Sequence, residues 1–189
     1  MATTINADTS DGLKLTADTS GTLELQSAGT TIATVSSTGI AMASGKTITD
    51  DAPSFSARMT SSQTVPTTTF TKILFNVENW DTNSNYDTTL SRFTPTVAGY
   101  YQFNGSAFIS SGSGRVFVLL FKNGAVAKYG SNLATTVNGG ITTAVNAQLE
   151  ANGSSDYFEC MLYQESGSNQ TINADRTLSW FDGFLAKAA

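Results

Sequence analysis

The sequence contains no histidine and only one cysteine, Cys160, among 189 residues. Without histidine, the chain lacks the commonest general base, the Ser-His and Cys-His nucleophile pairs and the usual nitrogen ligand of zinc. A single cysteine cannot form a disulfide within the chain, and its alternating apolar position predicts a buried thiol. A carboxylate pair is the remaining catalytic option, and no cleft motif accompanies one. We therefore expect no catalytic residues and a protein that is not an enzyme.

Charge and long apolar runs are also scarce. Charged residues make up 13% of the chain, the net charge is −5, and there is no basic run. Nucleic-acid binding depends on Lys and Arg at phosphates, so we expect no nucleic-acid partner. No apolar run is long enough to span a bilayer, which predicts no membrane insertion. The first residues lack the basic and apolar regions of a secretory signal, so we expect assembly in a cytoplasm.

Thr, Ser, Asn and Gly dominate the polar positions, and this composition favours strands and turns over helices. Asn123-Gly124 and Asn152-Gly153 are strong turn signals between alternating segments. The pattern predicts an all-β sandwich or jelly roll with a loop at residues 76–85. We expect strands at residues 54–59, 69–75, 90–94, 99–109, 115–122, 125–130, 141–149, 157–164 and 177–185. The strand at 115–122 is almost continuously apolar, which predicts cover on both faces, by the core and by a partner chain or loop.

A repeat of about ten residues occupies residues 8–47. Each unit opens on turn residues and continues with paired apolar residues, which predicts very short strands: Leu13/Leu15, Leu23/Leu25, Ile32/Val35 and Ile40/Met42. So few large apolar residues cannot form a monomeric core, so the repeat favours association of several chains. The alternative is a flexible Ser/Thr/Gly linker. Pro53 marks the boundary, giving an N-terminal region at 1–50 and a domain at 53–189.

Residues 75–108 carry aromatic residues and one glycine at specific intervals. Asp81 lies six residues after Phe75, and Tyr86, Phe93 and Gly99 follow at intervals of five, seven and six. Together with Tyr101, Phe103 and the closing stretch at 179–185, this spacing resembles the signature of the C1q-like domain, the family of complement C1q and tumour necrosis factor. One departure is Gly105, where the family usually has an aromatic residue; the glycine predicts a close backbone approach across that strand.

The resemblance implies a jelly roll that packs as a homotrimer around a three-fold axis. It also implies that the matching residues form the core and the trimer contacts: Phe75, Tyr86, Phe93, Gly99, Tyr101, Phe103, Phe181, Gly183 and Phe184. Some C1q-like proteins bind calcium, and Asp81 and Asp87 in an oxygen-rich loop are weak candidates for such a site. The alternative there is a turn held by Asx hydrogen bonds. We expect no other cofactor.

Three further aromatic residues, Trp80, Tyr129 and Tyr163, are expected to be exposed and are candidates for contact with a sugar or a protein. The repeat at 8–47 resembles, more loosely, the trimeric β-shafts of bacteriophage fibre proteins. Together these features predict a trimeric tail or head fibre on the virion surface, assembled in the host cytoplasm. Residues 1–50 would join other virion proteins, and the C1q-like tip would bind a host-surface receptor or polysaccharide.

Three alternatives remain open at this stage. A capsid decoration or cement protein with a purely structural role would share the trimer and the repeat. A fibre that cleaves polysaccharide would need a carboxylate pair in a cleft, and the sequence has no motif for one. A bacterial adhesin or spore-surface C1q-like protein would be supported by a collagen-like Gly-X-Y tract, which is absent from this sequence.

Overall fold

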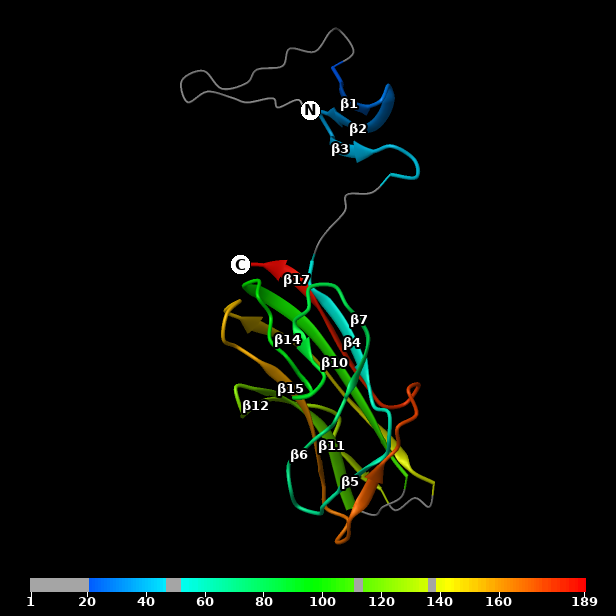
Figure 1. Cartoon of the computed structure of the whole chain (residues 1–189), viewed down its shortest axis with the longest axis vertical. Helices are drawn as coiled ribbons and strands as arrows, with labels where there is room; N and C mark the ends of the chain where they lie inside the picture. The colour runs from blue at the N-terminus through cyan, green and yellow to red at the C-terminus, as the bar shows by residue number, and fades with distance from the viewer. Residues whose placement is uncertain (1–20, 47–51, 111–113, 136–138) are drawn as a thin grey trace. The chain divides into compact units, whose positions relative to one another are not determined.

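The computed structural model describes residues 21–46, 52–110, 114–135 and 139–189, and every regular element in them is a β-strand. The chain divides into two compact units, Met1–Asp50 and Asp51–Ala189, which are described separately (Figure 1). The repeat units at residues 8–20, with Leu13 and Leu15, lie outside the described residues. Among the residues described, no helix could cross a membrane.

The N-terminal unit contains a three-stranded antiparallel sheet of β1 (Leu23–Ser27), β2 (Thr30–Ser36) and β3 (Gly39–Met42). Ala28 and Gly29 join β1 to β2 with φ angles of 48° and 73°, as a two-residue hairpin turn of this handedness requires. The short strands predicted at Leu23/Leu25 and Ile40/Met42 are present. The short strand predicted at Ile32/Val35 is present too, as β2. Ile32 and Val35 point to opposite faces of this strand, and Ala33 shares the face of Val35.

The pairing of these strands places the apolar residues other than Ile32 on one face of the sheet. Leu23 pairs with Val35 and Val35 with Ile40, while Leu25 pairs with Ala33 and Ala33 with Met42. Only Ala33 is buried in this set, and the exposed fractions of Leu25 and Ile40 are 48% and 67%. The N-terminal sheet therefore has an apolar face that the described residues of its own unit do not cover.

The C-terminal unit is a sandwich of two antiparallel sheets (Figure 1). The first, here called the β10 sheet, runs β14–β10–β17–β4–β7, with β16 and β5 continuing from one end of β10. Its strands are β4 (Ser54–Arg58), β5 (Gln63–Val65), β7 (Val77–Asp81), β10 (Gly99–Ile109), β14 (Ile141–Ala151), β16 (Gln170–Ile172) and β17 (Trp180–Ala188).

The second sheet, here called the β15 sheet, runs β12–β11–β15–β9–β8, with β13 on β11 and β6 on β15. Its strands are β6 (Thr71–Lys72), β8 (Tyr86–Asp87), β9 (Arg92–Phe93), β11 (Gly114–Lys122), β12 (Ala125–Tyr129), β13 (Leu133–Thr135) and β15 (Phe158–Gln164). Asn123 and Gly124, with φ angles of 54° and 79°, form the predicted turn between β11 and β12.

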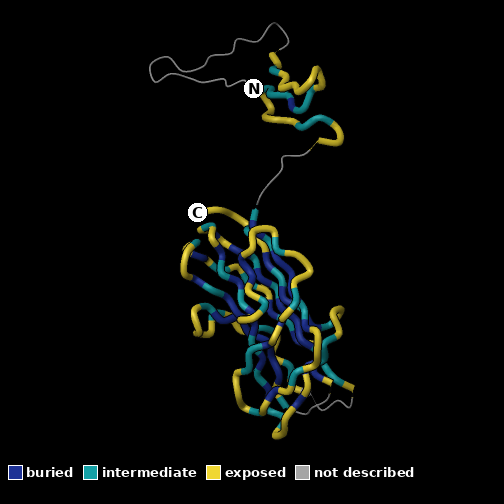
Figure 2. Tube along the Cα trace, viewed as in Figure 1, coloured by how far each residue is buried: buried dark blue, intermediate teal, exposed yellow. Residues whose placement is uncertain are grey.

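Buried residues gather between the two sheets of the C-terminal unit (Figure 2). This core is rich in aromatic residues. The ring of Phe55 stacks on that of Phe93 at 4.3 Å, and the ring of Phe103 lies 4.4 Å from that of Phe158. A Cβ atom at Gly183 would lie 2.8 Å from Phe103 and 2.9 Å from Phe55, so only glycine leaves room for both rings. This packing fixes the position of β17 in the β10 sheet.

A second, smaller apolar cluster lies on the opposite, outward side of the β15 sheet. Phe117, Leu119 and Phe121 are buried there, with Met161 and Tyr163 packed against them. Alternate residues of β11 therefore enter two different clusters, which explains its unbroken apolar run. The prediction that both faces of this strand are covered is confirmed, and residues of the same chain contribute to the cover of the outward face.

The predicted strands differ from the structure mainly in the first half of the domain. Residues 76–85 were expected to form a loop, but they contain β7, a polar edge strand that pairs with β4. The predicted strand at 69–75 is reduced to β6, and the one at 90–94 to β9, because Ser91 adopts a left-handed φ of 49°. Strands β5, β13 and β16, each three residues long, were not predicted.

The expected backbone approach at Gly105 is wrong. A Cβ atom there would lie 2.8 Å from Cys160 Sγ and 3.4 Å from Val145 Cγ1. The space beside Gly105 is thus taken by side chains, chiefly by a thiol from the opposite sheet. Cys160 is buried as predicted, and burial raises the pKa of its thiol above the ordinary range.

Candidate functional site

The face of the β10 sheet that points away from the core, here called the outer face, carries a row of paired side chains. Asn104 on β10 pairs with Asp182 on β17, Asp182 pairs with Ser56 on β4, and Ser56 pairs with Trp80 on β7. These residues alternate with core residues such as Phe103, Phe181 and Phe55, so the strand period places them outward. Four strands thus bring a carboxylate, an amide, a hydroxyl and an indole to one row.

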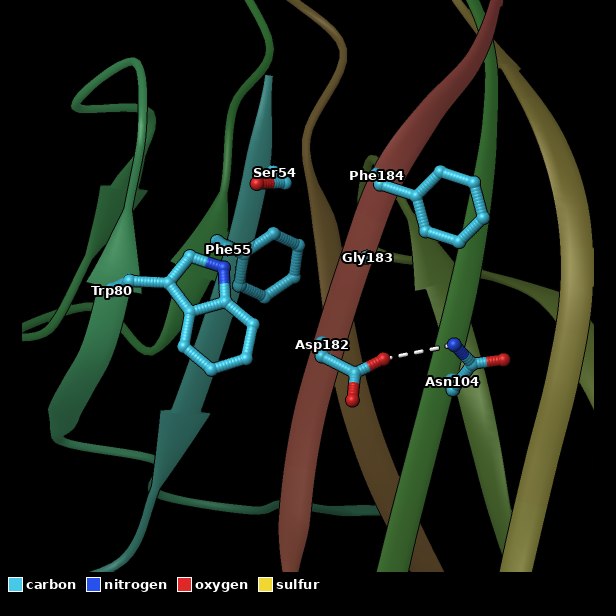
Figure 3. A pocket seen from close by; sticks show the side chains of 7 residues that line it. All are labelled: Ser54, Phe55, Trp80, Asn104, Asp182, Gly183 and Phe184. Atoms are coloured by element: carbon cyan, nitrogen blue, oxygen red, sulfur yellow. Dashed lines mark hydrogen bonds between the residues drawn. The ribbon is translucent and has the colours of Figure 1, made fainter. Parts of the chain in front are cut away.

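A pocket of about 260 Å³ lies on this face. It is lined by Ser54, Phe55, Trp80, Asn104, Asp182, Gly183 and Phe184 (Figure 3). Figure 3 shows Trp80 and Phe184 on either side of Asp182, whose carboxylate points toward Asn104. The volume is slightly below the roughly 300–1,000 Å³ of pockets that enclose a small ligand.

The carboxylate of Asp182 is held by its neighbour. Asn104 Nδ2 donates a hydrogen bond of 2.8 Å to Asp182 Oδ1, and Gln102 Nε2 donates one of 3.1 Å to Asn104 Oδ1. Burial raises the pKa of the Asp182 carboxyl above its usual range, because desolvation outweighs the stabilising hydrogen bond from Asn104. Further cover on this face would desolvate the carboxyl more and favour its neutral form.

Large aromatic residues are exposed on the same face. The exposed fractions are 53% for Trp80, 48% for Phe184 and 45% for Tyr100. Scattered exposed apolar residues are normal, but several large ones on one sheet face are typical of an interaction surface. The outer face of the β10 sheet therefore has the composition of a protein contact surface, with a polar row between aromatic rings.

The outward side of the β15 sheet carries a second aromatic surface, here called the ring row: Phe70, Tyr163, Phe117 and Tyr129. Consecutive ring centroids in this order are 5.0, 5.1 and 5.6 Å apart. Tyr129 and Phe70 are 63% and 43% exposed, while Phe117 is buried between them. The ring row is the accessible edge of the smaller apolar cluster.

Polar side chains adjoin the two middle rings of the ring row, Tyr163 and Phe117. Tyr163 donates its hydroxyl to Glu165 Oε1 at 3.1 Å, and Arg115 Nη1 lies 3.7 Å from the same carboxylate oxygen. The guanidinium carbon of Arg115 is 5.6 Å from the centre of the Phe117 ring, and Arg115 Nε donates to Asn132 Oδ1 at 3.4 Å. Desolvation and the Glu165 carboxylate raise the pKa of Tyr163, so its hydroxyl stays protonated.

An ion cluster occupies another part of the β15 sheet. The buried carboxylate of Glu159 accepts from Lys72 Nζ at 2.6 Å and from Arg92 Nη2 at 2.9 Å. The Arg92 guanidinium also lies 3.9 Å from the centre of the Tyr157 ring. Both cations tie β15 to β6 and β9, so this cluster has a structural explanation.

Most residues that match the family signature lie in the core, as predicted. Phe75, Tyr86, Phe93, Tyr101, Phe103 and Phe181 are buried, and so are Gly99 and Gly183. Tyr86 donates its hydroxyl to the Phe75 carbonyl at 2.8 Å, and burial raises the pKa of Tyr101 to about 12. Phe184 is the exception: it lies on the outer face, so a place in the core is wrong and a place in a trimer contact stays a prediction.

The predicted ligand-contact residues lie on different surfaces. Trp80 is exposed on the outer face of the β10 sheet and Tyr129 on the ring row. The expectation that Tyr163 is exposed is wrong, because its ring packs between those of Phe70 and Phe117 and is partly buried. Sequence reasoning missed Phe70 and Asn104; Phe70 lies in a Thr-rich stretch with no strand period to mark it.

The two calcium candidates both bind backbone groups of their own loop. Asp81 accepts from the backbone N–H groups of Asn83 at 3.2 Å and Tyr86 at 2.7 Å. Asp87 accepts from those of Thr89 and Leu90 at 2.8 and 2.9 Å. These bonds favour the Asx-turn alternative. Within the described ranges there is no group of three or more His, Cys, Asp or Glu side chains that could hold a metal ion, and the calcium site stays a prediction.

Comparison with known proteins identifies the fold of the C-terminal unit. No protein-family model and no curated protein matches the sequence. Among solved structures, the globular domain of zebrafish complement 1qA protein is 18% identical, covers 73% of this chain and 99% of its own, with a TM-score of 0.54. The Eiger TNF of S. frugiperda is 10% identical over 73% of this chain and 93% of its own, with a TM-score of 0.57.

A third similar structure, murine APRIL, is 5% identical and covers 71% of this chain and 98% of its own, with a TM-score of 0.57. Identities this low show the fold alone. The chain is therefore all-β and contains a C1q/TNF-like jelly roll, as the spacing of its aromatic residues predicted.

Proposed function

We propose that this protein is a non-enzymatic, homotrimeric surface protein of a bacteriophage virion. Its jelly roll is the exposed tip, and residues 1–50 join it to other virion proteins. The tip contacts the host surface, through a receptor or a polysaccharide. The chain assembles in the host cytoplasm, where the other proteins of the virion are made.

The observation that carries the proposal is the apolar face of the N-terminal sheet, which residues 21–46 do not cover. Leu25 and Ile40 lie on this face, and their exposed fractions are 48% and 67%. Among the described residues of this unit, Ala33 is the one buried apolar residue, so the sheet forms no core of its own there, and a small unit without a core is stabilised by association. Packing the same face from several chains together removes it from water, and each buried apolar side chain contributes about 1.5–3 kcal/mol.

The outer face of the β10 sheet supports self-association of the tip. Its exposed rings, Trp80, Tyr100 and Phe184, surround a row that contains a single half-buried carboxylate, Asp182. C1q-like domains, which the sequence resembles, pack three around one axis. A trimer would bury these rings and would explain why Phe184 follows the family spacing although it lies outside the core.

Placement on a virion rests on the repeat at residues 8–47, which resembles the shafts of phage fibre proteins. Fibre and capsid decoration protein are the two versions of this placement, and immunogold electron microscopy of intact phage particles separates them. Label at tail or head fibres supports the proposal, and label spread over the capsid lattice supports decoration. Absence of label from particles would contradict both.

Host contact is tested by competition. Purified full-length protein added to host cells before phage should reduce adsorption if the tip binds the host surface. A phage that lacks residues 53–189 should adsorb poorly, provided that its particles remain intact by electron microscopy. Unchanged adsorption of such particles would contradict a role in attachment.

A further inference from the structure

We propose that the ring row on the β15 sheet is a binding site for an uncharged saccharide. Tyr129 and Phe70 would pack against the C–H faces of sugar rings, and Arg115 and Glu165 would hydrogen-bond to sugar hydroxyls. The inference rests on the proposed function, for which it names the ligand class and the site.

The arrangement of rings and polar groups provides the first argument. Aromatic rings carry partial negative charge on their faces and attract the C–H groups of a pyranose. Phe117 contacts the rings of both Tyr129 and Tyr163, and the Arg115 guanidinium lies over the ring of Phe117, so this one residue joins the aromatic rings to the polar groups. A sugar ring on Tyr129 therefore lies on the same surface as donors and acceptors for its hydroxyls.

The charge of the site favours a neutral ligand. Arg115 and Glu165 stand side by side, and their side chains remain 51% and 33% exposed. A guanidinium and a carboxylate together can donate to and accept from vicinal hydroxyls. An acidic ligand would meet the Glu165 carboxylate and a basic one the Arg115 guanidinium, whereas an uncharged saccharide opposes neither.

The size of the surface favours a saccharide over a folded protein. Two rings, Tyr129 and Phe70, are 63% and 43% exposed, and each offers at most about 150–250 Å² of contact area. A stable protein interface needs about 800 Å² from each partner. Charged side chains also adjoin the middle of the row, as sugar recognition requires, whereas the centre of a protein interface is depleted in charge.

The site is compatible with the proposed trimer. The outer face of the β10 sheet and the ring row lie on opposite sides of the sandwich, because the core separates the two sheets. Burial of Trp80, Tyr100 and Phe184 between subunits would leave Tyr129 and Phe70 accessible. Each subunit would then present one saccharide site, and several weak sites on one particle would bind with avidity.

The test uses the full-length protein on an array of neutral and acidic oligosaccharides, followed by titration calorimetry with the neutral oligosaccharide that binds. Tyr129→Ala and Arg115→Gln should each weaken binding about tenfold or more, the order expected for loss of a stacked ring or a charged hydrogen bond. Val126→Ala is the matched control, because Val126 lies on the same strand and is 37% exposed. It should bind like the wild type.

Unchanged native mass and melting temperature of each variant show that it is folded and assembled. Binding only to acidic oligosaccharides, no binding to any neutral one, or equal affinity in Tyr129→Ala and wild type would overturn the saccharide site. The saccharide site would also be overturned if Tyr129→Ala lost binding to a protein partner but kept its affinity for the saccharide. None of these results bears on the proposal that the protein is a trimer on the virion. The native mass and the immunogold labelling test that proposal separately.

Discussion

Gly105 offers a sharp test of how the two sheets pack, because the Cys160 thiol of the opposite sheet occupies the space that a side chain at position 105 would need. In Gly105→Ala the new methyl group would start 2.8 Å from Cys160 Sγ, a distance that no unstrained Cβ contact reaches. Overpacking of this kind costs about 1–3 kcal/mol. The backbone is not the obstacle, since φ at Gly105 is outside the left-handed region.

The sign of the effect distinguishes packing from backbone entropy. Replacing glycine by alanine at an unstrained position stabilises a protein by about 0.4–1 kcal/mol. Gly139→Ala is the matched control, because a Cβ atom there meets nothing within 4 Å and φ is again outside the left-handed region. We expect Gly139→Ala to be neutral or slightly stabilising and Gly105→Ala to be destabilising by about 1–2 kcal/mol.

A double-mutant cycle assigns the clash to Cys160. Cys160→Ala alone should cost about 1 kcal/mol, the loss of one buried group. The double variant Gly105→Ala/Cys160→Ala should be more stable than the sum of the single effects by about 1 kcal/mol, within the range for contacting residues. Urea unfolding followed by tryptophan fluorescence at one protomer concentration measures all four proteins. A Gly105→Ala variant as stable as wild type, or strictly additive effects, would refute the packing described here.

Three further predictions concern stability. Phe103→Ala removes a ring at the centre of the core and should cost about 3–5 kcal/mol in urea unfolding; a cost below 1 kcal/mol would mean that the core is not packed as described. Burial raises the pKa of Asp182, so the wild type loses stability as the pH rises through the pKa of the folded state. Asp182→Asn should therefore melt at a higher temperature than the wild type at neutral pH, and this difference should shrink on acidification. Equal melting temperatures at every pH would contradict this. Hydrogen bonds from Lys122 and Asn123 lower the pKa of Asp156, so their stabilisation is lost as the pH falls through that lowered value. Asp156→Asn should therefore melt lower at neutral pH and decline less on acidification, whereas the exposed Glu150→Gln should behave as wild type.

The sequence was most informative where apolar periodicity and turn residues agreed. Strand β10 spans the predicted residues 99–109 because alternating aromatic residues and Gly99 delimit it, and the Asn123-Gly124 turn forms as expected. The C1q-like spacing predicted the jelly roll correctly, since the residues that define it, such as Phe103 and Phe181, are those that fill the core.

Prediction failed where tertiary contacts decide the structure. Strand β7 carries Glu78, Asn79 and Trp80, whose polar, exposed pattern looks like a loop until β4 pairs with it. The rings of Phe70 and Tyr163 meet only because β6 pairs with β15. Asn104 and Asp182 are 78 residues apart in the chain, and only the register of β10 with β17 brings them together.

The native mass of the full-length protein tests the central claim most directly. Native mass spectrometry or light scattering should give three times the mass of one chain. The exposed apolar side chains of the N-terminal sheet and of the outer face of the β10 sheet favour association, and the resemblance to C1q-like domains implies that three chains associate. Replacing Leu25 and Ile40 together by Ser should weaken the assembly, whereas Thr30→Ser, on the same sheet, should leave it intact. A monomeric wild-type protein at micromolar concentration would contradict the account.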